Sequence, residues 1–71
     1  MTVYDFMLQF DSHKEFRIMQ GGRDITEDEP ISVAYIGCGY EYRKEVLKAL
    51  EKQAETYDIE NNIIRISEWS D

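Results

Sequence analysis

Hydrophobic and polar positions repeat most regularly between Tyr40 and Tyr57. Apolar side chains recur there at intervals of three and four residues, and charged side chains or glutamine fill most positions between them. This spacing places the apolar residues on one face of an α-helix. The pattern predicts a core-facing helix over residues 40–57, whose apolar stripe consists of Tyr42, Val46, Leu47, Leu50, Ala54 and Tyr57.

Three shorter segments are predicted to be strands. Residues 15–20 (EFRIMQ) alternate between two faces, and Gly21–Gly22 after them permits a tight turn. Residues 31–36 (ISVAYI) are rich in β-branched and aromatic residues, which predicts the most buried strand. Residues 63–67 (IIRIS) predict a last strand by the same alternation.

A short helix is predicted near the amino terminus, over residues 3–10. Thr2 is followed three residues later by Asp5, which is typical of a helix cap with an acid in the first turn. The apolar residues that follow fall on one face of this helix: Val3, Phe6, Met7 and Phe10.

The predicted element order is therefore α-β-β-α-β. An antiparallel hairpin of the first two strands, with the last strand beside the first, gives a three-stranded antiparallel sheet in the spatial order 2-1-3. Both helices then cover one face, and the other face is left to Arg17, Met19, Arg65 and some aromatic residues. We predict a single α+β domain that spans residues 1–71.

The length of 71 residues limits the stability that one core can provide to about 3–5 kcal/mol. A single cysteine, Cys38, excludes an internal disulfide, and a single histidine, His13, leaves no Cys/His cluster for zinc. We therefore expect no cofactor, and we expect a partner to be the source of additional stability.

The net charge of −7 is unevenly distributed. Residues 41–57 contain four Glu and four Lys or Arg, so the other segments carry eleven acids against Lys14, Arg17, Arg23 and Arg65. Such a surface repels nucleic acid and anionic lipid and favours a basic partner. The alternative is that acidity only keeps a small protein soluble.

Only the segment Gly37-Cys38-Gly39 has a catalytic context, because the backbone amides of such a loop and the amino terminus of the predicted helix after it attract anions, including a thiolate. The third glycine of a dinucleotide site and the lysine and hydroxyl of a P-loop are absent, and His13 is the only candidate base. The acid-rich segment 24–29 also lacks the glycine of a calcium loop. A structural turn is the favoured interpretation of Cys38.

The chain is short and acidic, opens with MTVYDF and closes near the hydrophobic strand IIRIS. In these features it resembles small accessory proteins of bacteriophages and prophages, which include acidic anti-CRISPR inhibitors of host defence. The resemblance implies an inhibitor that presents carboxylates where a host nuclease expects phosphates.

The leading hypothesis is a non-catalytic inhibitor that occupies the Lys/Arg-lined, nucleic-acid-binding groove of a basic host protein and binds no nucleic acid or membrane itself. Tyrosine and tryptophan at the ends of elements are common anchors of interfaces. The expected contacts are these aromatic residues and the acids outside the main helix: Asp24, Glu27, Asp28, Glu29, Tyr40, Tyr42, Tyr57, Asp58, Glu60 and Trp69.

Two alternatives accompany this hypothesis. One is a homodimer joined through the open sheet face or a strand edge. The more remote one is a thiol-reactive enzyme that uses Cys38. The amino terminus lacks a basic region and no apolar run reaches the ~20 residues of a membrane span, so we expect a cytoplasmic protein, in a bacterial host if it is phage-encoded.

Overall fold

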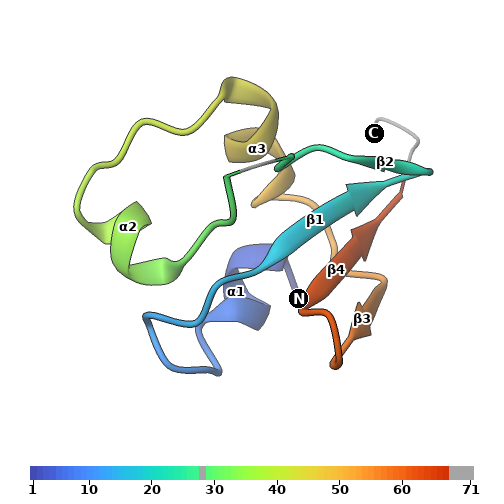
Figure 1. Ribbon diagram of the computed structural model, residues 1–71, viewed down its shortest axis with the longest axis horizontal. Coiled ribbons are helices and arrows are strands. Elements are labelled where there is room, and N and C mark those ends of the chain that lie inside the picture. Colours follow the sequence, from blue (N-terminus) through green and yellow to red (C-terminus); the bar gives the residue numbers. More distant parts are fainter. Residues whose placement is uncertain (28, 68–71) are drawn as a thin grey trace.

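The computed structural model describes residues 1–27 and 29–67, which form a small α+β fold (Figure 1). The described residues contain three short helices and a four-stranded mixed sheet. In chain order the elements are α1 (Val3–Met7), β1 (Arg17–Gln20), β2 (Arg23–Asp24), α2 (Val33–Gly37), α3 (Lys44–Ala49), β3 (Thr56–Asp58) and β4 (Ile63–Ile66).

The strands lie in the order β2-β1-β4-β3. The last strand lies beside the first, as predicted, but it runs parallel to it, with Ile18 opposite Ile64. The hairpins β1–β2 and β3–β4 are antiparallel and form the two edges. The predicted wholly antiparallel, three-stranded sheet is therefore wrong in strand number and in the direction of its central pair.

The predicted amino-terminal helix is confirmed at its start. The Thr2 side chain accepts a hydrogen bond from the Asp5 amide at 3.1 Å, and Asp5 accepts one in return from the Thr2 amide at 3.3 Å. The helix α1 ends at Met7, earlier than predicted. Its first amide, that of Val3, donates to the carbonyl of Lys52 at 2.8 Å, which ties the helix to the segment that follows α3.

The predicted strand over residues 31–36 is wrong. Only Ile31 pairs as a strand residue, through two hydrogen bonds with Phe16. Ser32 caps the short helix α2, because its side chain accepts a hydrogen bond from the Tyr35 amide at 3.3 Å. A local cap of this kind favours a helical turn over an extended backbone.

The predicted helix over residues 40–57 is confirmed only in its centre, where α3 spans Lys44–Ala49. The chain leaves the helix because it pairs with the amino terminus: Gln53 forms a bridge with Thr2, and the Met1 amino group donates to the Gln53 side chain. Residues 56–58 then form the edge strand β3, in which Tyr57 pairs with Ile64. Tertiary pairing overrides helix propensity at the carboxyl end of the pattern.

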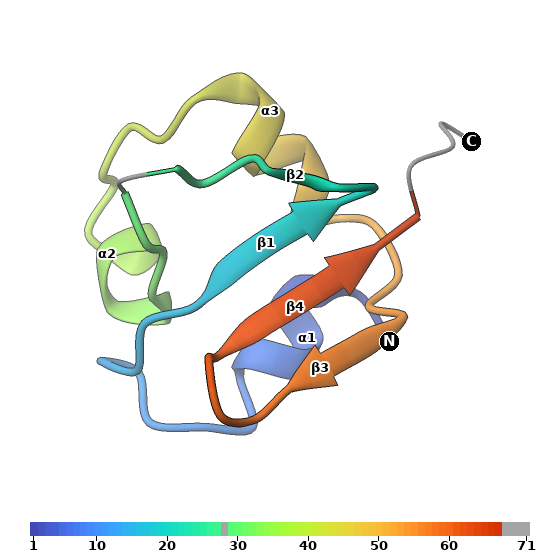
Figure 2. The same cartoon turned by 45° about the vertical axis from the view of Figure 1, so that its right-hand side comes forward.

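The core lies between the sheet and the three helices, all on one face of the sheet (Figure 2). Arg17, Met19 and Arg65 alternate with buried isoleucines and so lie on the uncovered face, as predicted. Several aromatic residues contact one another on the helix side of the sheet, where Phe6 packs against Tyr57. The buried apolar residues are Val3, Met7, Phe16, Ile18, Ile25, Ile31, Tyr42, Val46, Ala49, Leu50, Ile64 and Ile66.

Candidate protein-binding surface

Asp24 is occupied inside its own turn. One carboxylate oxygen accepts hydrogen bonds from the Thr26 amide at 3.0 Å, the Thr26 hydroxyl at 2.5 Å and the Glu27 amide at 3.1 Å. The other oxygen lies 3.7 Å from Arg17 Nη1. Asp24 therefore shapes the segment that follows β2 and does not present a free carboxylate.

Glu27 and Glu29 project from the same segment and are exposed. Glu27 lies 3.6 Å from Arg43 Nη1, and Glu29 accepts a hydrogen bond from the Tyr40 hydroxyl. Asp28 lies outside the described residues. Exposed ion pairs of this kind contribute about 0–1 kcal/mol, so a partner's cations can replace them at small cost.

Two exposed tyrosines adjoin these acids. Tyr40 is 49% exposed and its ring centroid lies 5.9 Å from that of Tyr35, which is 54% exposed. The hydrogen bond to Glu29 raises the pKa of Tyr40. Glu27, Glu29, Tyr35 and Tyr40 together form what we call the acid–tyrosine surface. Sequence reasoning missed Tyr35 because it placed this residue in a buried strand.

Tyr42 was predicted as a partner contact, but it is only 6% exposed and belongs to the core. Its ring packs 4.7 Å from that of Tyr40. Burial raises the pKa of Tyr42, and the main chain of Ser32 opposes this increase. The hydroxyl makes no hydrogen bond of standard geometry with the described residues.

The remaining predicted contacts lie at the opposite edge of the sheet, in and after β3. Asp58 closes the β3–β4 turn, where hydrogen bonds from the Asn61 side chain and amide lower its pKa. Tyr57 is half-buried and donates to Asn62 Oδ1 at 2.9 Å, and Glu60 is exposed. The predicted acids therefore form two separate groups, and Trp69 lies outside the described residues.

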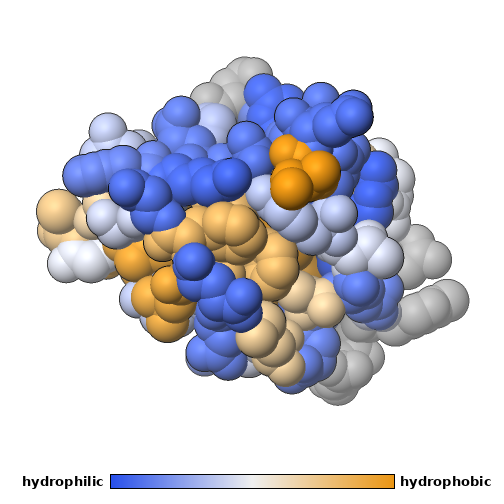
Figure 3. All heavy atoms as spheres, turned by 90° about the horizontal axis from the view of Figure 1, so that it is seen from below, coloured by the Kyte–Doolittle hydropathy of each residue, from blue (hydrophilic) through white to orange (hydrophobic). Residues whose placement is uncertain are grey.

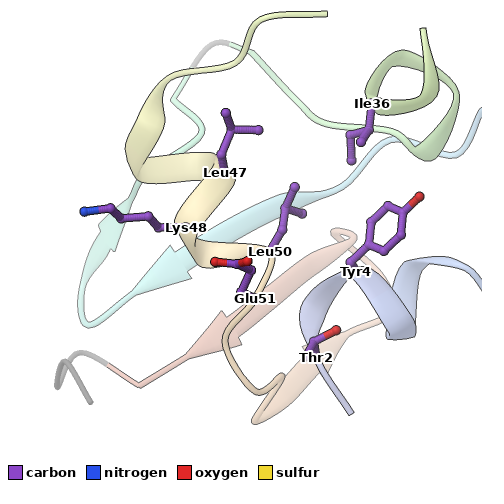
Figure 4. A pocket seen from close by; sticks show the side chains of 7 residues that line it. All are labelled: Thr2, Tyr4, Ile36, Leu47, Lys48, Leu50 and Glu51. Atoms are coloured by element: carbon purple, nitrogen blue, oxygen red, sulfur yellow. The ribbon is translucent and has the colours of Figure 1, made fainter. Parts of the chain in front are cut away.

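An open apolar groove that the sequence did not predict lies between the three helices (Figure 4). Its volume is about 640 Å³. Leu47 of α3 and Ile36 of α2 face each other across it. Leu50, the cap residue after α3, and Tyr4 of α1 also point into it (Figure 4). The other lining residues are Thr2, Lys48 and Glu51.

Apolar side chains reach the surface both in the groove and outside it. Seen from below, the molecule has a patch of apolar residues surrounded by hydrophilic ones (Figure 3). The exposed large apolar residues include Met1, Leu8, Leu47 and Ile59. Contiguous exposed apolar area is typical of interaction sites.

Cys38 and His13 line a second, smaller pocket of about 210 Å³, together with Ser32, Ala34 and Tyr35. Both residues are exposed, and no hydrogen bond or ion pair within the described chain joins them. In the same part of the chain, no group of three or more His, Cys, Asp or Glu is placed to hold a metal ion.

No protein-family model matches this chain, and comparisons with curated proteins and with solved structures found no significant similarity. Among residues 1–27 and 29–67, no helix has the length and apolar character that a bilayer span requires.

Proposed function

We propose that this chain is a non-catalytic, phage-encoded inhibitor that binds a basic, nucleic-acid-binding protein of host defence. The observation that carries the proposal is the acid–tyrosine surface, where exposed carboxylates adjoin two exposed tyrosine rings. Carboxylates attract the Lys and Arg side chains of a nucleic-acid groove, and tyrosine is enriched among residues that dominate binding energy.

The overall charge supports the same proposal. The net charge of the chain is −7, and the three described ion pairs engage only the acids Asp24, Glu27 and Glu45. The resulting negative field increases the association rate with a basic partner and opposes binding to nucleic acid.

The two alternatives have less support. The uncovered sheet face carries Arg17, Arg65 and Asp24 around Met19, whereas stable homodimer interfaces are more apolar. For a thiol enzyme, Cys38 lacks a hydrogen-bonded base among the described residues.

The test uses the purified chain on a resin, a bacterial lysate and two charge-matched double variants. Glu27→Gln/Glu29→Gln removes two charges from the acid–tyrosine surface, and Glu41→Gln/Glu55→Gln removes two exposed charges that form no described ion pair. We expect the first variant to retain less than about one tenth of the protein that the wild type retains, with a weaker dependence on salt.

We expect the control variant to retain as much protein as the wild type. Equal losses in the two variants show that only net charge matters, and unchanged retention in both removes the acid–tyrosine surface from the interface. Either result contradicts the proposal.

A further inference from the structure

The apolar groove between the helices contains a leucine that the fold does not bury. Leu47 is 42% exposed, whereas its neighbours Val46 and Leu50 are buried. Leu47 belonged to the apolar stripe predicted for the core, but α2 does not approach α3 closely enough to cover it (Figure 4). The groove is therefore an apolar surface formed by three elements without a covering segment among the described residues.

The lining favours a helical occupant over an extended one. An extended peptide gains its main-chain hydrogen bonds from a free strand edge. All the lining residues come instead from helices, from their caps or from the residue after a cap. A helix satisfies its own main chain and needs only apolar anchors one turn apart, which is the common helix-in-groove mode.

The charges near the groove favour a basic occupant. Glu51 lies beside Leu50 at one end of the groove, whereas the Lys48 side chain points away from the other lining residues (Figure 4). A second copy of this chain also carries a net charge of −7 and is repelled. A basic helix is attracted both by the whole molecule and by Glu51.

We propose that the groove binds one amphipathic, basic helix of the partner protein. Two apolar side chains of that helix lie between Ile36 and Leu47, and a Lys or Arg lies beside Glu51. This inference rests on the proposed function, since it assumes a basic protein partner, and it adds a second contact to the acid–tyrosine surface.

The probe is a fluorescent peptide of about 18 residues made of leucine and lysine, with leucine at every third or fourth position so that one face is apolar. Two control peptides keep its length: one replaces every leucine with alanine, and the other replaces every lysine with glutamate. Binding to the full chain is measured by fluorescence anisotropy. Methyl NMR then locates the site on the wild-type chain.

We expect the leucine–lysine peptide to bind and to shift the methyl signals of Ile36, Leu47 and Leu50, but not those of Leu8 and Ile59. Leu47→Gln is expected to weaken binding about tenfold. The matched control Leu8→Gln removes a leucine outside the groove that is 51% exposed, against 42% for Leu47, and is expected to leave affinity unchanged.

Five results contradict the inference. Equal binding of the alanine–lysine peptide shows attraction by charge alone, which overturns the groove but leaves the proposed function standing. Equal binding of the leucine–glutamate peptide overturns the basic partner instead. Equal weakening by Leu8→Gln, or methyl shifts outside the groove, places the contact elsewhere. Absence of binding by all three peptides removes the site.

Discussion

The buried hydroxyl of Tyr42 permits a sharp prediction about stability. The Tyr42 ring packs in the core, and its hydroxyl makes no standard hydrogen bond with the described residues. Replacing Tyr42 with phenylalanine keeps the ring and removes a polar atom that lost its hydration on folding. We therefore expect Tyr42→Phe to be more stable than the wild type.

An unsatisfied buried polar group costs about 1–3 kcal/mol. The main chain of Ser32 interacts weakly with the hydroxyl, so the lower end of that range applies, and Tyr42→Phe is expected to raise the free energy of unfolding by about 1 kcal/mol. For a domain of 71 residues this corresponds to an increase in Tm of about 7 °C.

The matched control is Tyr57→Phe, which also removes a tyrosine hydroxyl. This hydroxyl, unlike that of Tyr42, donates a hydrogen bond to Asn62 Oδ1 at 2.9 Å. Loss of that hydrogen bond is expected to lower the free energy of unfolding by about 1 kcal/mol. Urea and thermal unfolding, followed by circular dichroism at pH 7, measure both variants. Shifts of the same sign, or a destabilised Tyr42→Phe, refute the reasoning.

The pH dependence provides a second measurement for Tyr42. Because burial raises the pKa of Tyr42 above 10.0, the folded state resists ionisation more than the unfolded state does. The stability that the neutral Tyr42 side chain contributes is fully present below pH 10. It is lost as pH rises through the higher pKa that Tyr42 has in the folded protein. Tyr42→Phe is expected to lose less stability than the wild type over this range, in denaturant titrations at successive pH values.

Three further predictions concern other residues. Ile64→Ala in the central strand pair is expected to lower the free energy of unfolding by about 2–5 kcal/mol and to leave the chain largely unfolded. The control Ile63→Ala, on the uncovered face, is expected to remain folded by circular dichroism. If both variants are folded, the assignment of Ile64 to the core is contradicted. Hydrogen bonds from Asn61 lower the pKa of Asp58, so its contribution to stability is present above pH 3.8 and is lost as pH falls through the lower folded pKa. The difference in the free energy of unfolding between the wild type and Asp58→Ala should therefore become smaller as the pH is lowered. A difference that does not change with pH contradicts the role of the Asp58 carboxylate in closing the β3–β4 turn. Cys38→Ser is expected to leave the unfolding free energy within about 0.5 kcal/mol and partner retention unchanged, and loss of retention favours the thiol alternative.

The elements that the sequence predicted well are those determined by local chemistry. The Thr2–Asp5 capping pair fixes the start of α1, and the alternation around Ile18 and Ile64 fixes the two central strands. Each signal acts within a few residues of the chain. Distant pairing holds these segments in place, since β1 pairs with β4 along its length, but it agrees with the local signal and does not change the type of element.

The elements that were wrong depend on pairing between distant segments. Residues 51–58 have helical spacing, but they pair with the amino terminus and with β4 instead. At residues 31–36 the cap at Ser32 outweighs the β-branched composition. Ser32, a favoured helix-capping residue three positions before Tyr35, was the sequence feature that could have predicted α2.

The candidate site was predictable only in part. Sequence charge identified Glu27 and Glu29, and the excess of aromatic residues identified Tyr40. The exposure of Tyr35 depends on α2, which the sequence did not predict. The groove depends on the distance between three helices, which no local pattern encodes.

The most direct test of the account is competition between this chain and nucleic acid for the retained partner. Proteins bound to the immobilised chain are challenged with duplex DNA at constant ionic strength, and the released fraction is measured. If the chain occupies a nucleic-acid groove, DNA competes for that groove and releases the partner. A control challenge with NaCl at the same ionic strength and without DNA leaves the partner bound. A partner that binds DNA while it remains attached to the chain contradicts the account.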